Sequence, residues 1–344
     1  MFCPQPQRPQ KAQAWRTGGK EGLVRMLLDN QTPYEAELIH GPNGPEDHGT
    51  ALIIKKTLPL HPKITPGFVW PVSLQELKTD LAVFPFDHHF PTAKMDVMVC
   101  GFAFASGGRA TREMHVSLSI GQFHYNQTIL GNRKWKKRAF GYKFTDPEPF
   151  TQMPLTLQNA FGGKSPHEGG DIACLDNPEG KGFILKGVEA EGIHLPNIER
   201  PDQRIKSPKD QPPTTCMAPY PFSGKLRYEP LMVDGKMKDF AGEDSHLYFG
   251  QAHPDLMMDR LDPGTMLCLH GMHPQQHDLK VIVPENKLEA VVSINGKEEL
   301  LPITLDGLCI FAHENCFGLK YRAAGSFKLE PRQERKVILR EVSS

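Results

Sequence analysis

The sequence lacks an excess of charge of either sign, because its 344 residues include 40 lysine and arginine residues and 40 aspartate and glutamate residues. A neutral protein has no long-range field that would attract nucleic acid or an anionic membrane to its whole surface. We therefore expect any binding to be local. This balance predicts no nucleic acid among the partners of the protein.

Long apolar runs are also missing. Residues 1–15, MFCPQPQRPQKAQAW, contain no apolar core of the length that a secretion signal needs, and no later segment approaches the roughly 20 apolar residues of a membrane span. Lipidation of Cys3 would need an apolar segment before it, and only two residues precede this cysteine. We expect a cytoplasmic protein without membrane insertion.

Cysteine is present, but it forms no CxxC pair and its count is odd. The seven cysteines are Cys3, Cys100, Cys174, Cys216, Cys268, Cys309 and Cys316. A chain of this length buries a sizeable core without disulfides, so cysteines are not needed to hold it together. We expect reduced thiols, as in a cytosol.

Motifs of known chemistry are absent from the sequence, which has no GxSxG elbow, no HExxH pair and no Walker loop. None of its fifteen histidines has a standard metal-ligand spacing. The best candidate groups are His88-His89, the set of His270, His273 and His277, and His313-Glu314. We predict a binding protein without catalytic residues, metal or cofactor. A catalytic triad whose members meet only in space stays open as an alternative.

Glycine and proline are abundant, with 31 of each, which indicates many turns and few long helices. Apolar or alternating segments between turn residues predict strands. They lie at 24–28, 51–54, 96–104, 114–120, 123–130, 278–284, 288–294, 299–305, 308–313, 317–322 and 336–342. We expect 96–104 and 114–120 to form a hairpin, and Asn295-Gly296 to turn another. A short helix is expected from Met153 or Leu155 to Phe161, because two glycines follow it.

These segments predict a mainly β fold, with sandwich-like or meander sheets, long ordered loops and a few short helices. We divide the chain into a flexible arm at 1–20, a β-rich portion at 21–150, a loop-rich segment at 151–244 and a second β-rich portion at 245–344. We expect the two β-rich portions to pack together, while the central loops cover one face and contact a partner.

Three turn-dense sequences lie close together in the loop-rich segment: NAFGG at 159–163, DNPEGKGF at 176–183 and LPNIERPDQ at 195–203. Asparagine side chains bond nearby backbone and proline rings fix φ, so such loops can be rigid without regular structure. Ordered loops are either plain architecture or a binding surface, and large side chains dominate protein interfaces. The candidate partner-binding residues are Asn159, Phe161, Gly162, Gly163, Asn177, Pro178, Phe183, Leu195, Pro196, Asn197, Ile198, Tyr220 and Phe222.

A basic cluster, NRKWKKR, runs from Asn132 to Arg138 and contains Trp135. One interpretation is the solvated end of a hairpin. A second is base stacking on Trp135 with phosphate contacts, as in single-strand binders, although the zero net charge and the lack of a second basic stripe argue against it. Contact with an acidic protein partner is a third interpretation.

Several motifs in a fixed order carry a resemblance to a known family. They are NQTPYEA at 30–36, IIKKT at 53–57, GFAFASGGRATREMHVSLSIG at 101–121, LQNAFGG at 157–163, NPEGKGF at 177–183, LPNIERP at 195–201, LDGLCIF at 305–311 and LKYRA at 319–323. Over roughly residues 24–325, the chain resembles the domain-of-unknown-function family 2169 (DUF2169).

The resemblance implies an adaptor or chaperone of type VI secretion, encoded near genes for spike (VgrG), PAAR-tip and toxin proteins, that helps to mount an effector on the spike. The implied partner is the effector, a PAAR-tip protein or a spike protein, and no catalytic residue comes with this assignment. Two other functions stay open. A β-scaffold hydrolase or carbohydrate-active enzyme would have a cleft with two facing carboxylates or a histidine-bound metal. A structural component of the baseplate or spike would assemble symmetrically with itself.

Overall fold

The structure is a computed structural model, and it describes residues 26–42, 47–89, 91–220, 232–233, 236–237, 249–328 and 333–342. In these residues the fold is mainly β, as predicted, and its strands are joined by long loops and short 3-10 helices. The arm expected at 1–20 lies outside the described residues.

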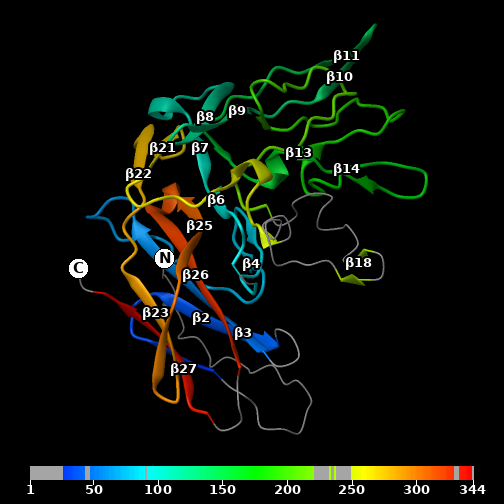
Figure 1. Ribbon diagram of the computed structural model, residues 1–344. Helices are drawn as coiled ribbons and strands as arrows, with labels where there is room; N and C mark the ends of the chain where they lie inside the picture. Colours follow the sequence, from blue (N-terminus) through cyan, green and yellow to red (C-terminus); the bar gives the residue numbers. More distant parts are fainter. Residues whose placement is uncertain are drawn as a thin grey trace, which may run out of the picture.

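A six-stranded central sheet runs through the middle of the molecule (Figure 1). Its strands, in spatial order, are β2 (Glu35–Pro42), β3 (Asp47–Pro59), β26 (Cys316–Lys328), β25 (Ile303–Phe311), β6 (Met95–Val99) and β20 (Met257–Met258). Neighbouring strands are antiparallel except β25 and β6, which run parallel. The sheet therefore takes strands from both β-rich portions of the chain.

Two further sheets lie above and below the central sheet in the view of Figure 1. The upper sheet is antiparallel and contains β17 (Ile198–Glu199), β9 (Phe123–Leu130), β8 (Glu113–Ile120), β21 (Met266–His270) and β22 (Asp278–Ile282). The lower sheet contains β1 (Leu27–Asn30), β27 (Arg335–Glu341), β23 (Leu288–Ile294) and β24 (Lys297–Leu301), with β1 parallel to β27. The strands expected near the C-terminus thus belong to three sheets.

Short two-stranded pieces and single helical turns complete the described chain. The strand pairs are β4 (Leu77–Lys78) with β5 (Val83–Phe84), β7 (Phe102–Phe104) with β12 (Gln152–Pro154), β10 (Trp135–Arg138) with β11 (Gly141–Phe144), β13 (Phe161–Gly162) with β16 (Lys181–Gly182), β14 (Lys164–Ser165) with β15 (Ile172–Ala173), and β18 (Met232–Val233) with β19 (Lys236–Met237). The 3-10 turns are η1 (Ser106–Gly108), η2 (Leu157–Asn159), η4 (Pro254–Leu256) and η5 (Ala312–Glu314).

The prediction that 96–104 and 114–120 form a hairpin is wrong, although both segments contain strands. β6 pairs with β25 and β20, β7 pairs with β12, and β8 pairs with β9 and β21. The chain leaves the central sheet between β6 and β7. The Cys100 amide still bonds that sheet, whereas the Gly101 carbonyl accepts a hydrogen bond from Leu155 at 2.9 Å. One continuous apolar segment is therefore shared by two sheets.

The prediction of a helix between Met153 and Phe161 is also wrong, because only the 3-10 turn η2 forms there. Phe161 lies in β13, and its carbonyl accepts from the Asn177 side chain at 3.1 Å and from the Thr214 hydroxyl at 3.0 Å. Bonds to distant segments replace the bonds that a helix would make within itself. By contrast, the expected turn at Asn295-Gly296 joins β23 to β24, and both residues have the positive φ of such a turn.

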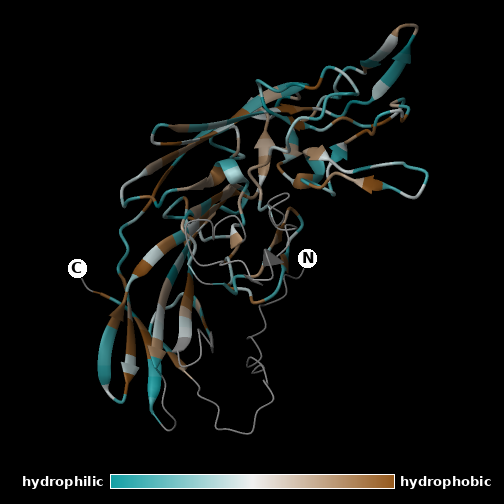
Figure 2. Ribbon diagram, turned by 45° about the vertical axis from the view of Figure 1, so that its right-hand side comes forward, coloured by the Kyte–Doolittle hydropathy of each residue, from teal (hydrophilic) through white to brown (hydrophobic). Residues whose placement is uncertain are grey.

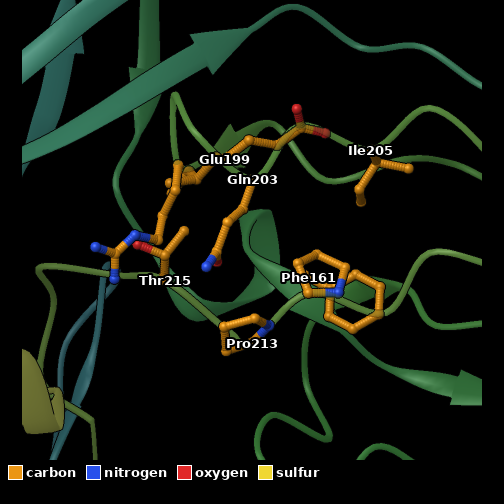
Figure 3. A pocket seen from close by; sticks show the side chains of 9 residues that line it. Phe161, Glu199, Gln203, Ile205, Pro213 and Thr215 are labelled. Atoms are coloured by element: carbon orange, nitrogen blue, oxygen red, sulfur yellow. The ribbon is translucent and has the colours of Figure 1, made fainter.

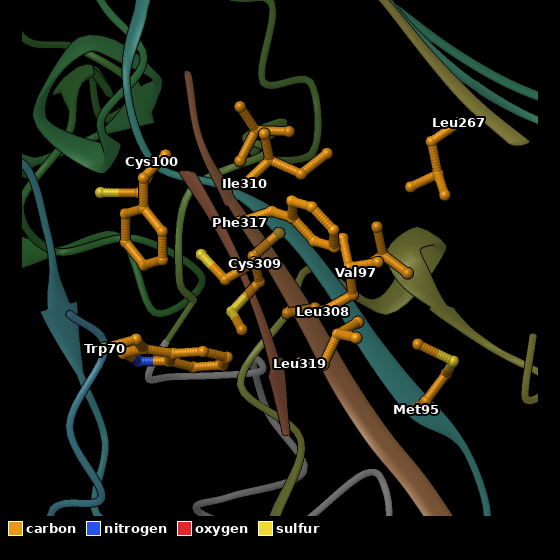
Figure 4. Packing of buried hydrophobic residues seen from close by; sticks show 14 of the residues in the cluster. Trp70, Met95, Val97, Cys100, Leu267, Leu308, Cys309, Ile310, Phe317 and Leu319 are labelled. Atoms are coloured by element: carbon orange, nitrogen blue, oxygen red, sulfur yellow. The ribbon is translucent and has the colours of Figure 1, made fainter. Parts of the chain in front are cut away.

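One large hydrophobic cluster links the three sheets. It includes Val97 of the central sheet, Leu267 of the upper sheet and Val292 of the lower sheet, and Figure 4 shows part of it around β6, β25 and β26. Trp70, from the connector at 60–94, is fully buried in the same cluster. A Cβ on Gly318 would lie 2.4 Å from the Trp70 ring, so glycine is needed for this close contact.

Six charged side chains form a buried ion network on the central sheet. They are Lys55, Asp87, Asp96, Asp306, Lys320 and Arg322. The network contains three basic and three acidic side chains, and burial raises the pKa of one of the acids, Asp96. Lys55 Nζ lies 2.7 Å from Asp87, yet burial lowers the pKa of Lys55 to about 8. Desolvation of the ammonium therefore outweighs its attraction to the carboxylate.

Asp306 is the carboxylate shared by two cations of this network. Arg322 donates to it at 2.5 Å, and Lys320 Nζ lies 3.6 Å away. Burial opposes ionisation of Asp306, but the charges of Arg322 and Lys320 outweigh it and hold the pKa of this carboxyl well below its ordinary value. Arg322 also donates to the carbonyls of Asp87 at 2.9 Å and His89 at 2.7 Å. The network thus fastens the connector at 60–94 to the sheet.

We predict that Asp306→Asn lowers the free energy of unfolding by about 3–5 kcal/mol, because two buried cations then lose their common carboxylate. Urea unfolding followed by circular dichroism measures the change. Glu298→Gln is the matched control, since Glu298 is exposed on β24 and its substitution should change the stability by less than about 0.5 kcal/mol. Equal stabilities of the two variants would contradict a structural role for the network.

Buried thiols make the stability sensitive to alkaline pH. The six described cysteines are free, and burial raises the pKa of Cys216 to about 12 from an ordinary value of 9.0. Between these two values the unfolded chain releases the proton while the folded chain keeps it. The free energy of unfolding therefore falls as the pH rises through this window.

We expect Cys216→Ala to reduce that fall. Between about pH 8 and about pH 10.5, wild-type protein should lose about 2 kcal/mol more of its free energy of unfolding than the variant does. Urea unfolding at both pH values measures the difference, and the measurement near pH 8 controls for the packing change caused by the substitution. An identical loss in both proteins would show that Cys216 ionises equally in the folded and unfolded chains.

Candidate partner-binding surface

Residues 131–220 form a layer of irregular chain beside the upper sheet, which we call the loop layer. Figure 1 shows most of it in green, extending from β9 away from the central sheet. Its strands are only two to four residues long. It nevertheless has a hydrophobic cluster of its own, formed by Trp135, Phe161, Ile184, Ala190, Leu195 and Ile205. The loop layer is therefore packed although it contains little regular structure.

Asn197 joins the loop layer to the upper sheet, where β17 pairs with β9. Its carbonyl accepts from the Leu130 amide at 2.8 Å, and its side-chain Nδ2 donates to the Leu130 carbonyl at 2.7 Å. The Asn197 amide donates to the Asn159 carbonyl at 2.8 Å. One asparagine thus connects the sheet to two loop segments.

Asn177 holds together the segments 157–163 and 177–183. Its Nδ2 donates to the carbonyls of Leu157 at 2.8 Å and Phe161 at 3.1 Å. Its own carbonyl accepts from the Gly163 amide at 2.7 Å. The asparagine therefore supplies hydrogen bonds that neighbouring strands would supply in a sheet.

Two consecutive glycines allow this close approach. Gly162 and Gly163 have φ values of 147° and 93°, a region that favours glycine. A Cβ on Gly163 would lie 2.4 Å from the carbonyl oxygen of Gly180, and one on Gly162 would lie 2.1 Å from that of Asn177. Any larger residue would separate the two segments.

A chain of ion pairs fixes the start of the loop layer to the upper sheet. Arg133 pairs with Glu199, and both are buried. Burial lowers the pKa of Arg133 even beside this carboxylate. Arg204 then bridges Glu199 at 2.8 Å and Glu113 of β8 at 2.9 Å, and its hydrogen bond lowers the pKa of Glu113. The residues that precede β10 are thus held rigidly.

The structure brings the predicted partner-binding residues together, but it places most of them inside the loop layer. The buried ones are Phe161, Gly162, Gly163, Asn177, Leu195, Pro196, Asn197, Ile198 and Tyr220. Asn159, Pro178 and Phe183 are half-buried, and Phe222 lies outside the described residues. Their contacts are made within the chain; the Tyr220 hydroxyl, for example, donates to the Asp176 carbonyl at 2.5 Å. They support the surface from within, and their contact with a partner stays a prediction.

Sequence reasoning missed the most exposed large hydrophobic side chain among the described residues of the loop layer. Phe140 lies in the turn between β10 and β11 and is 100% exposed. In Figure 2 this hairpin is hydrophilic along one strand and hydrophobic at its tip. Trp135 is instead 2% exposed, and its ring packs 5.8 Å from that of Phe144. The interpretation of Trp135 as a base-stacking residue is therefore wrong.

A small pocket lies within the loop layer, and a larger open hollow lies at the upper sheet. The pocket in Figure 3, between the segments that carry Phe161, Glu199 and Thr215, has a volume of about 10 Å³, which is room for roughly one water molecule. A second, open hollow of about 420 Å³ lies at one end of the upper sheet. Its lining residues are Ser106, Arg109, Ala110, Thr111, Met114, His115, His270 and His277. The predicted residues Phe161 and Ile198 thus line a cavity of the size of a water molecule.

Within the ranges that the structure describes, no group of three or more His, Cys, Asp and Glu residues is arranged to hold a metal ion. His270 and His277 do lie together, with ring centroids 4.2 Å apart, and His270 Nδ1 is hydrogen-bonded to Asp278 at 2.7 Å. No helix among the described residues combines the length and the apolar character needed to cross a membrane.

Comparison with known proteins relates most of the chain to one family. The family described as "Uncharacterized protein conserved in bacteria (DUF2169)" matches residues 67–322. This range begins in the connector, contains the whole loop layer and ends at Arg322 of the ion network. It is shorter than the range expected from the motifs, because those at 30–36 and 53–57 precede it. No curated protein and no solved structure matches the chain.

We predict that Gly163→Ala destabilises the loop layer by about 2 kcal/mol or more, since alanine is strained at this φ and its methyl group meets the Gly180 carbonyl. Hydrogen exchange measured by mass spectrometry should accelerate in segments 157–163 and 177–183. Gly169→Ala is the matched control, because no atom lies within 4 Å of a Cβ at Gly169. Equal exchange in the two variants would contradict the close crossing.

Proposed function

The chain belongs to the DUF2169 family, and from this premise we propose that it is a cytosolic adaptor or chaperone for type VI secretion. It binds an effector, or the PAAR-tip region of one, and helps to load it onto the spike. One observation carries the proposal, which is that the loop layer is a preformed surface with its own hydrophobic cluster beside the sheets.

Preformed loops suit a protein that must bind another protein. Ordering a flexible loop during association costs free energy, and a surface that is ordered beforehand avoids this cost. In the loop layer, Asn177 and Asn197 bond the backbone of separate segments, and the buried pair of Arg133 and Glu199 fixes its start. Loops held in this way on a rigid scaffold are the usual carriers of binding function.

The dimensions of the loop layer favour a macromolecular partner over a small ligand. Small-molecule pockets usually have volumes of roughly 300–1,000 Å³, whereas the pocket beside Phe161 has about 10 Å³. A standard protein interface needs roughly 800 Å² on each partner and no deep cavity. The outer surface of the loop layer, which ends in the β10–β11 hairpin, offers a shape of that kind.

We predict that the full chain, co-expressed with the effector or PAAR-tip protein encoded beside it, forms a complex that survives size-exclusion chromatography. The Gly163→Ala variant should lose at least half of this complex, because its loop layer is no longer preformed, and Gly169→Ala should keep it. An effector from an unrelated secretion cluster serves as the cargo control.

Failure of the wild-type chain to bind either the effector or the PAAR-tip protein would contradict the adaptor function. Light scattering of the purified chain tests the structural rival. A symmetric assembly formed without cargo would favour a component of the baseplate or spike, and a particle of one chain that gains mass only with cargo would favour the adaptor.

A further inference from the structure

The β10–β11 hairpin has two faces whose charges are balanced differently. Successive side chains of a strand point to opposite faces. Trp135 and Lys137 therefore share an inner face with Phe144 and Tyr142, which lie opposite them in the register. The inner face packs on the loop layer, where Trp135 belongs to the hydrophobic cluster. The outer face carries the alternate residues.

Cations of the inner face and of the hairpin base are neutralised by the chain itself. Lys137 Nζ lies 2.8 Å from Glu189, and the Lys137 amide donates to Glu191. Arg133, just before the hairpin, pairs with Glu199. Carboxylates of the loop layer thus lie next to the cations of the inner face and of the hairpin base.

The outer face carries a row of cations without such partners. Its members are Lys134, Lys136, Arg138 and Lys143, all exposed. Within the described chain, none of these four forms an ion pair, whereas Lys137 between them does. Lys136 and Lys143 lie directly opposite each other in the register, and like charges in that position destabilise a hairpin. An external anion would remove this repulsion.

Phe140 adds an exposed apolar group at the tip of the hairpin, next to the row of cations. It lies in the two-residue turn after Arg138 and is 100% exposed. Figure 1 shows the hairpin projecting beyond the rest of the loop layer, so the turn is accessible from several sides. A single exposed apolar side chain is common on protein surfaces. An aromatic side chain beside a row of unpaired cations has the composition of an interface anchor with a charged rim.

We propose that the outer face of the β10–β11 hairpin, together with Phe140, docks an acidic segment of a partner protein. Carboxylates of that segment lie along the row of cations, and its apolar side chains enclose the Phe140 ring. Complementary charge speeds association and selects the partner, while the desolvated aromatic ring contributes affinity. The inference rests on the proposed function, because it names the chemistry of the cargo that such an adaptor binds.

The geometry favours a protein segment over nucleic acid. From Lys134 to Arg138 the row spans about 13 Å at the rise of roughly 3.3 Å per residue of a strand, so it reaches only a few phosphates. Nucleic-acid affinity comes from many phosphate contacts. Trp135, the aromatic residue inside the cluster, is buried and cannot stack on a base.

The test uses the full chain and a fluorescein-labelled peptide of about twelve residues, mostly glutamate with two leucines. Wild-type protein should bind this peptide, with an affinity that falls as salt is raised. The triple variant Lys136→Glu, Arg138→Glu, Lys143→Glu should weaken binding at least about tenfold, and Phe140→Ser should weaken it several-fold with less effect on the salt dependence.

A charge-matched control separates the hairpin from overall charge. The exposed residues Lys209, Lys280 and Lys297 lie elsewhere on the surface, and their triple change to glutamate should leave peptide binding within about twofold. Equal urea midpoints for all variants would show that they fold. Equal peptide binding by the hairpin triple variant and wild type would overturn the inference. Binding of a single-stranded oligonucleotide of equal charge in preference to the peptide would also overturn it.

Effector co-purification distinguishes the two proposals. If wild type and the hairpin triple variant retain the effector equally, the adaptor function stands and the docking surface is wrong. If wild type binds the effector and the triple variant loses it, both proposals are supported. If wild type binds no effector, the adaptor function fails, and the peptide measurement alone decides whether the hairpin is an acidic-segment site.

Discussion

Buried backbone amides and carbonyls need hydrogen-bond partners, and in the loop layer two asparagines supply them where no long strand runs. Asn177 bonds the carbonyls of Leu157 and Phe161, and Asn197 bonds both backbone groups of Leu130. Each of these bonds joins segments that are distant in sequence. The shape of the outer surface, and the position of the hairpin that it carries, therefore depend on side-chain bonds more than on a sheet.

The buried ion network holds the connector at 60–94 in a comparable way, because its side chains also bond to backbone carbonyls of an irregular segment. Replacing buried ion pairs by apolar residues often costs nothing in stability, so the network is weak evidence for a stability role. Its bonds are directional, however, since Arg322 reaches the carbonyls of Asp87 and His89 while it pairs with Asp306. An apolar side chain would pack there without selecting one position of the connector. We interpret the network as a device that fixes where the connector lies on the central sheet.

Sequence patterns predicted the positions of strands and turns better than they predicted which strands pair with each other. The strand at 123–130 has the predicted bounds, and the Asn295-Gly296 turn lies where its type requires, because alternation and turn chemistry are local properties. The pairing of 96–104 was missed because β6 bonds β25, about 200 residues later in the chain, and hydropathy does not encode that partner. In the loop layer, rigid loops were predicted from asparagine, proline and glycine. The inward direction of the Phe161 and Ile198 side chains was not predicted. Phe161 packs in the hydrophobic cluster of the loop layer, and Ile198 packs in the large cluster that links the sheets.

Burial decides which charges of this neutral chain are balanced internally. Lys55, Lys320 and Arg322 are buried and lie close to carboxylates, as the cost of desolvating an unpaired ion demands. Exposed charges are under no such demand, because water solvates them and salt screens them. The exposed cations on the outer face of the hairpin can therefore lack carboxylate partners, even though the whole chain has no excess of positive charge. A local charge of this kind acts only at short range, which suits recognition of one partner better than attraction of many.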